Sequence, residues 1–265
     1  MSVEARPSTE HQPTVSTFHF KGRSGKMYHT DFHHYEGPPR DETRNNFAHP
    51  RFTDVIPQLA PMIRRTWPLV TDAQGNHVSG YQESTVTSTV AKFDKFADFA
   101  LTYDEAGMLV AFNVYKVGKT EIKAQNIQVI YVEHAGTLPE FQGDGITAAM
   151  RNEFFKRKNP DIVCGSSANG IIYKANEKIA KDQGFAFYPT AEETPAPISK
   201  LGHQIVDELG ITSAPLDDRL VRTYSGPVAA SQIPHPLAES LQLTSAQHVF
   251  YMLLNPNLNR RLLEE

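Results

Sequence analysis

The stretch LPEFQGDGITAAM, residues 138–150, contains the feature on which the fold prediction depends: two glycines between a strand and a helix. The preceding run NIQVIYVEHAGTL has the composition of a β-strand, and apolar residues recur at helical spacing from Ile146 to Phe154. The first N–H groups of a helix have no intrahelical acceptor and lie at the positive end of its dipole. This arrangement predicts an anion-binding loop. The alternative is that Gly143 and Gly145 only permit a tight connection.

The composition is that of an ordinary globular protein of 265 residues, with 40% hydrophobic and 21% charged residues. A net charge of −4 provides no broad cationic face, so we expect neither nucleic acid nor a membrane surface as a partner. No apolar run approaches the ~20 residues that cross a bilayer, and we expect a cytoplasmic protein. The only cysteine, Cys164, lies in the apolar run DIVCGSS and is expected to be buried rather than nucleophilic.

Strand and helix signals along the chain predict a mixed α/β fold with a central, mostly antiparallel sheet flanked by helices. An N-terminal hairpin around RSG precedes helices near residues 52–67 and 81–96, and a second hairpin around DEAG follows. After the glycine loop the order is helix, buried strand, helix and strand, through FAFYP. We expect a flexible polar tail over residues 1–16, a core over 17–189 and a C-terminal extension over 190–265 that packs on the same domain. The charged end NRRLLEE is expected to be partly frayed.

The glycine loop resembles the core motif of the GNAT superfamily of N-acetyltransferases, Q/R-x-x-G-x-G/A at the start of a helix. Gln142 and Gly145 occupy the matching places, whereas Thr147 stands where glycine or alanine is usual. The family ends its next helix with a Gly-Phe pair that leads into a strand, and KIAKDQGFAFYP is similar to this. The likeness is best over residues 97–189. Neither G-x-x-x-x-G-K-[ST] nor G-x-G-x-x-G is present, so those nucleotide-binding loops are not predicted.

The resemblance implies that the co-substrate is acyl coenzyme A, foremost acetyl-CoA, and that no metal is required. Backbone amides of the loop would hold its diphosphate, and the strand that ends near Leu138 would diverge from its neighbour and pair with the pantetheine arm. Asn169 would hydrogen-bond that arm, with a plain helix N-cap as the alternative. The implied cofactor-binding residues are Thr137, Leu138, Gln142, Gly143, Asp144, Gly145, Ile146, Thr147 and Asn169.

Acyl transfer to an amine needs a base, because an alkylamine with a pKa of about 10.4 is mostly protonated at neutral pH. Related enzymes often carry this base on the strand before the loop, which makes Glu133 the leading candidate. Strand alternation places Glu133 and His134 on opposite faces, and His134 would take the role if a bulge lies between them. Ala180 replaces the family's usual acid, a tyrosine, so Tyr173 is the substitute candidate, with packing as the alternative.

The predicted activity is transfer of an acetyl or other short acyl group to a primary amine, by direct attack in a ternary complex. The acceptor would be a small molecule or a peptide, and the sequence leaves a homodimer open. A coenzyme A-binding module without catalysis is one alternative, because Ala180 removes the usual acid. A metal-dependent enzyme using His29, Asp31 and His33 is another, although a polar strand face explains the same spacing. The basic turn GRSGK, residues 22–26, is expected to be a solvated hairpin turn rather than a phosphate site.

Overall fold

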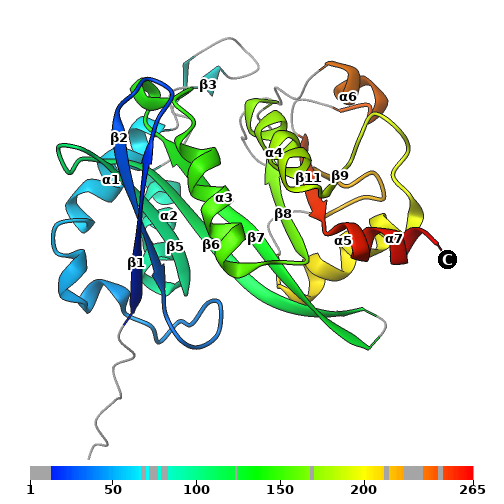
Figure 1. Cartoon of the computed structure of the whole chain (residues 1–265), viewed down its shortest axis with the longest axis horizontal. Coiled ribbons are helices and arrows are strands. Elements are labelled where there is room, and N and C mark those ends of the chain that lie inside the picture. Colours follow the sequence, from blue (N-terminus) through cyan, green and yellow to red (C-terminus); the bar gives the residue numbers. More distant parts are fainter. Residues whose placement is uncertain are drawn as a thin grey trace, which may run out of the picture.

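The protein folds around one nine-stranded sheet with helices on both faces (Figure 1). The computed structural model describes residues 13–66, 70–71, 77–78, 83–122, 124–167, 170–211, 215–223, 235–243 and 247–264. The strands of the sheet are β1 (Thr14–Lys21), β2 (Met27–His34), β5 (Asp98–Asp104), β6 (Leu109–Ile122), β7 (Gln125–Thr137), β8 (Ile162–Ser167), β9 (Ala186–Tyr188), β10 (Val221–Thr223) and β11 (Gln247–Leu254). A separate two-stranded sheet consists of β3 (Val70–Thr71) and β4 (His77–Val78).

The strand order is β1-β2-β5-β6-β7-β8-β11-β10, and β9 pairs with β11. Among the described strands of this sheet, β7 and β8 form the parallel pair and all other pairs are antiparallel. A parallel pair needs a crossover connection, which here contains the glycine loop and one helix. The predicted mixed, mostly antiparallel α/β class is therefore confirmed, as are the two hairpins.

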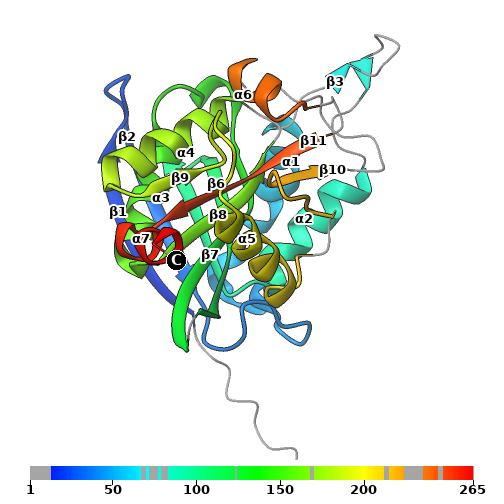
Figure 2. The same ribbon diagram turned by 90° about the vertical axis from the view of Figure 1, so that its right-hand side faces the viewer.

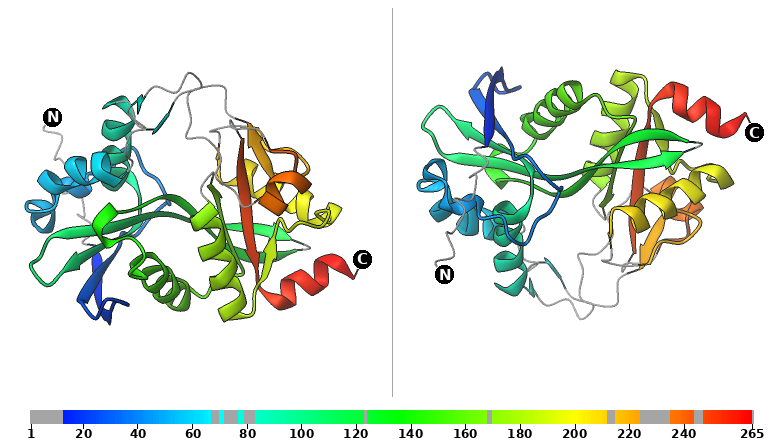
Figure 3. Two further views of the ribbon diagram at one scale, coloured as in Figure 1. Left: turned by 90° about the horizontal axis from the view of Figure 1, so that it is seen from above. Right: turned by 90° about the horizontal axis from the view of Figure 1, so that it is seen from below.

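The helices divide between the two faces of the sheet (Figure 3). Phe112 of β6 packs against Phe93 on one face, whereas Tyr115 stacks on Phe154 at 3.8 Å on the other. Lys116 lies next to Tyr115 and so points to the first face, where it donates to the carbonyl of Leu209. The helices are α1 (Ile56–Thr66), α2 (Glu83–Lys95), α3 (Ile146–Lys158), α4 (Gly170–Gln183), α5 (Ala196–Glu208), α6 (His235–Ser240) and α7 (Pro256–Leu263).

These contacts place α2 and the end of α5 on one face and α3 on the other. Figure 3 shows α1 and α2 across the long strands β6 and β7 from α3. The predicted helices near residues 52–67 and 81–96 correspond to α1 and α2, and α1 is continuous although Pro61 lies inside it. No helix in the described part of the chain is both long enough and apolar enough to span a bilayer.

The C-terminal segment contributes strands to the same sheet, because β11 lies between β8 and β10 (Figure 2). The expectation of a frayed C-terminus is wrong. Residues 256–263 form α7, whose Leu258 and Leu262 are buried one helical turn apart against the core beneath α5. The side chain of Asn255 caps this helix by accepting a hydrogen bond from the amide of Asn257 at 3.0 Å.

Candidate active site

The predicted anion loop joins β7 to α3 and begins with a 3₁₀ turn, Pro139–Phe141. Gly143 and Gly145 both have φ near +85°, in the left-handed region that glycine adopts without steric cost. Gly145 is the N-cap of α3, so its conformation directs the following amides into the first helical turn. The backbone path therefore favours glycine at both positions.

The backbone amides of residues 143–148 have no acceptor among the described residues. The amide before them, that of Gln142, donates to the Pro139 carbonyl at 3.2 Å, and the amide after them, that of Ala149, donates to the Gly145 carbonyl at 3.0 Å. Intrahelical bonding cannot satisfy the first amides of α3. A run of available donors at a helix N-terminus is suited to bind a phosphate or another anion.

Side chains of the predicted loop residues hold it against the end of β7. Gln142 Nε2 donates to the Thr137 carbonyl at 3.2 Å, and the hydroxyls of Thr137 and Thr147 are 2.9 Å apart. Leu138 and Ile146 are buried in the core and so anchor the two ends of the loop. The predicted residues from Thr137 to Thr147 are thus brought together, whereas Asn169 lies outside the described residues.

The strand edge next to the loop is open. The parallel ladder between β7 and β8 extends from Val129, opposite Ile162, to Val132, opposite Gly165, and then stops. On its other side β7 stays paired with β6 as far as Thr137. Within the described residues, backbone groups of residues 133–137 therefore have no strand partner on the β8 side. An extended ligand can hydrogen-bond to such an edge as an added strand does.

A β-bulge places both candidate bases on the same side of β7. Val114 pairs with His134 and Tyr115 pairs with Val132, so Glu133 is an extra residue in the ladder. The alternation expected for a regular strand therefore does not hold here, and the bulged alternative, in which His134 becomes a candidate base, applies. Both side chains contact Lys92 of α2: its Nζ forms an ion pair with Glu133 and lies 2.7 Å from His134 Nε2.

The charges around this cluster set its protonation. Burial alone would raise the pKa of Glu133, but the ammonium of Lys92 and the neighbouring His134 and Lys116 outweigh it and hold that pKa below its usual value. Burial, reinforced by Lys92, lowers the pKa of His134 to about 4. At neutral pH the lowered pKa values leave Glu133 as a carboxylate and His134 as a neutral imidazole, and both groups bind the amino group of Lys92.

Tyr173 and Ala180 make their contacts elsewhere in the chain. The Tyr173 hydroxyl donates to the Pro189 carbonyl at 2.6 Å, and its ring packs edge-on against Phe187. Burial raises the pKa of Tyr173 above its usual value. A buried hydroxyl that donates to a backbone carbonyl cannot at the same time donate to a departing thiolate. Ala180 is buried in the core.

The N-terminal histidines lie in aromatic and polar strand contacts. His29 stacks on Tyr103, His33 stacks on Phe99, and Asp31 accepts a hydrogen bond from a threonine of β1. The described residues include no group of three histidine, cysteine, aspartate or glutamate side chains arranged to hold a metal ion. Cys164 is fully buried, as expected, and burial raises the pKa of its thiol.

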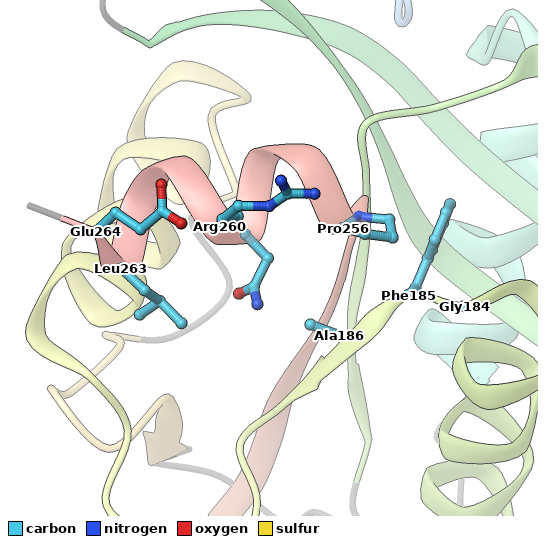
Figure 4. A pocket seen from close by; sticks show the side chains of 8 residues that line it. Gly184, Phe185, Ala186, Pro256, Arg260, Leu263 and Glu264 are labelled. Atoms are coloured by element: carbon cyan, nitrogen blue, oxygen red, sulfur yellow. The ribbon is translucent and has the colours of Figure 1, made fainter.

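Two hollows on the surface of the described chain bear on ligand binding. One, of about 430 Å³, lies beside the glycine loop, where Gln142 and Gly143 form part of its wall. The other, of about 500 Å³, lies between α7 and the start of β9 (Figure 4). Of the residues that line this second hollow, only Arg260 and Glu264 are charged. The hollow beside the loop adjoins the amides of residues 143–148, and this makes it the better candidate for an anionic ligand.

Two features of the site were missed by sequence reasoning. Lys92 precedes its partners Glu133 and His134 by about 40 positions, and nothing in its local sequence indicates the contact. The turn of the N-terminal hairpin packs on the glycine loop through Asp144, 120 positions away from Ser24. The sequence did contain one signal for the second contact, namely the acidic residue Asp144 inside a predicted anion-binding loop. Such a carboxylate is expected to have partners in another part of the chain.

No protein-family model matches the chain, and no curated protein sequence matches it. Among solved structures, nourseothricin acetyltransferase is similar over 34% of this chain and 49% of its own, at 19% identity and a TM-score of 0.26. A GNAT-family acetyltransferase from Listeria monocytogenes covers 65% of this chain and 94% of its own, at 14% identity and a TM-score of 0.37. A proposed acetyltransferase from Acinetobacter baylyi covers 91% and 93%, at 10% identity and a TM-score of 0.38. These matches agree with the GNAT resemblance of the sequence, but likenesses this loose carry no argument about activity.

Proposed function

We propose that the chain is a GNAT-type acyltransferase that moves an acetyl or other short acyl group from acyl-CoA to a primary amine. The observation that carries the proposal is the pairing of two features at the end of β7: the free amides of residues 143–148 and the open strand edge of residues 133–137. The first suits a diphosphate, and the second suits an extended amide-containing arm. Coenzyme A has both groups in sequence.

In this proposal the thioester lies near the bulge at Glu133, because the pantetheine arm runs along the open edge from the loop. The lone pair of the amine attacks the thioester carbonyl carbon and the C–N bond forms. The C–S bond then breaks, and the second proton that leaves the nitrogen goes, directly or through solvent, to the departing thiolate, so that CoA leaves as the thiol. Glu133 or His134 first accepts the proton of the amine. Since both groups have a lowered pKa, they pass this proton on to solvent rather than keep it.

The acceptor class is supported by Lys92. Its primary ammonium lies between the Glu133 carboxylate and the His134 imidazole. These two groups thus already bind the functional group that the acceptor would bring. We propose that the ammonium of the acceptor binds the same two groups, either beside Lys92 or in its place.

A coenzyme A-binding module without turnover is the second candidate. It is favoured by one observation, namely that Ala180 has no acid and the Tyr173 hydroxyl is engaged by Pro189. Thiolate departure would then have no general acid at either of these two positions, and general acid catalysis contributes typically 10²–10⁴-fold in rate.

Calorimetric titration with acetyl-CoA, followed by a thiol-release assay over a panel of primary amines, tests the proposal. Binding with thiol release that depends on an amine supports the transferase. Binding without release supports the module. Absence of binding contradicts both.

A further inference from the structure

Asp144 places a carboxylate inside the proposed phosphate loop, where it would repel an anion unless other groups neutralise it. Its side chain accepts hydrogen bonds from the Tyr28 hydroxyl at 2.6 Å, the Ser24 amide at 2.5 Å and the Ser24 hydroxyl at 2.8 Å. The pKa of Asp144 is held below its usual value, mainly by the hydrogen bond from Tyr28 and further by those from Ser24 and by the charge of Lys26. The carboxylate is thus directed at the β1–β2 turn.

The β1–β2 turn, residues 22–26, is fixed on the loop at close range. The Arg23 amide donates to the Asp144 carbonyl at 3.1 Å, and Arg23 Nη1 lies 3.5 Å from the Gly143 carbonyl. A Cβ atom at Gly22 would lie 2.4 Å from Asp144 Oδ2 and 2.7 Å from Tyr28 Cε2, so only glycine permits this approach. The turn is therefore a docked part of the loop structure and not a freely solvated hairpin end.

Docking brings two exposed cations, Arg23 and Lys26, to the hollow beside the loop. Lys26 Nζ lies 5.3 Å from the centre of the Phe141 ring. The acidic residues in the same wall are satisfied elsewhere: Glu140 forms an ion pair with Arg65, and Asp144 is bonded as described above. Two cations and two carboxylates thus line the hollow, and each carboxylate has an ion-pair or hydrogen-bond partner of its own.

We propose that this turn forms the second wall of a phosphate site, in which Arg23 and Lys26 bind a phosphate group of acyl-CoA opposite the amides of the loop. The inference rests on the proposed function, since it names residues for the same co-substrate. Arg23 can bind a phosphate with two parallel N–H groups, whereas Lys26 contributes a point charge. Asp144 is then a positioning residue, because it holds the turn without touching the phosphate.

The test is calorimetric titration of Arg23→Ala, Lys26→Ala and the double variant with CoA, 3′-dephospho-CoA and pantetheine at fixed ionic strength. Each single variant is expected to bind CoA about tenfold more weakly, since a charge-assisted hydrogen bond is lost. Binding of pantetheine, which has no phosphate, is expected to be unchanged. Lys119→Ala is the matched control: it removes an exposed cation from β6, opposite Gln128 and far along β7 from the loop.

The comparison of CoA with 3′-dephospho-CoA identifies which phosphate group the two cations bind. Equal weakening with CoA and 3′-dephospho-CoA assigns the two cations to the diphosphate, and weakening with CoA alone assigns them to the 3′-phosphate; either supports the inference. If wild-type protein binds CoA and the double variant binds it equally well, the inference is overturned while the proposed function stands. If wild-type protein binds no CoA, both are overturned.

A second variant separates the position of the turn from its charges. Gly22→Ala keeps Arg23 and Lys26 but pushes the turn away from Asp144. We expect it to weaken CoA binding while leaving pantetheine binding unchanged, a selectivity that general loss of stability would not produce. A Gly22→Ala protein that binds CoA as the wild type does, with a displaced turn shown by hydrogen exchange, contradicts the role of docking.

Discussion

A carboxylate introduced at Gly145 should weaken CoA binding far more than the isosteric amide. Both Gly145→Asp and Gly145→Asn have to adopt the positive φ of the native loop, which these two residues tolerate better than other side chains. A Cβ atom at this position would lie 3.6 Å from Arg23 Nε, in ordinary contact, so the added side chain fits. The two variants therefore share their steric and backbone effects and differ by one charge.

The size of the difference follows from Coulomb's law. At about 5 Å and an effective dielectric constant of about 20, one added charge repels one phosphate charge by roughly 3 kcal/mol, and exposure to water and salt reduces this to about 1–3 kcal/mol. Since 1.4 kcal/mol is a factor of ten, the Kd of the aspartate variant should exceed that of the asparagine variant by roughly 5-fold to 150-fold.

Isothermal titration with CoA at two salt concentrations measures this ratio, and the ratio should shrink at the higher concentration. Gly210 is a control position, because it also has positive φ and a Cβ atom added there would meet no described atom within 4 Å. Gly210→Asp and Gly210→Asn should bind CoA equally. If the two Gly145 variants also bind CoA equally, the loop is not where the phosphates lie.

Four further outcomes are expected. Glu133→Gln should lower kcat by about 10²–10⁴-fold with CoA affinity unchanged, and an unaltered kcat would remove Glu133 from proton transfer. Lys92→Met removes the ammonium that lowers the pKa of both Glu133 and His134, so the acid limb of the kcat/KM profile should move to higher pH; a fixed limb contradicts the assignment. Because the folded pKa of His134 is about 4 against an ordinary 6.5, the unfolded chain binds the proton more readily and stability falls as pH drops from about 6.5 towards 4. Urea unfolding should show His134→Gln reducing this loss by up to about 3 kcal/mol, and an unchanged loss in that variant contradicts the assignment. Phe154→Ala, which removes a buried ring stacked on Tyr115, should lower the unfolding free energy by about 3–5 kcal/mol in the same assay.

Local signals in the sequence located most elements because they depend on short-range spacing. The helix expected after the glycine loop is α3, Ile146–Lys158, and Gly184, expected to end a helix, has the positive φ of such a position. The C-terminal helix was missed because charged residues dominate the end of the chain, although Leu258 and Leu262 have the one-turn spacing of a buried face.

The arrangement of the candidate bases could not be derived in the same way. Strand alternation is fixed by the chain only while the ladder is regular, and one extra residue reverses it. Whether the bulge falls at Glu133 depends on how β6 and β7 pair over their whole length, with Tyr115 held against Phe154 on one face. The contact of Lys92 with both residues follows from that pairing and from the packing of α2.

Asp144 shows how a local contradiction can point to a distant partner. A carboxylate in a loop that binds an anion repels that anion. We therefore expect such a carboxylate only where other groups of the protein form hydrogen bonds or ion pairs with it. Here Ser24 and Tyr28 donate hydrogen bonds to the Asp144 carboxylate. These bonds hold the β1–β2 turn, with its two cations, at the same hollow. The Asp144 carboxylate keeps its charge, and the contact adds two positive charges beside it near the loop. The turn of the N-terminal hairpin, which the sequence predicted to be solvated, is on this reasoning part of the phosphate site.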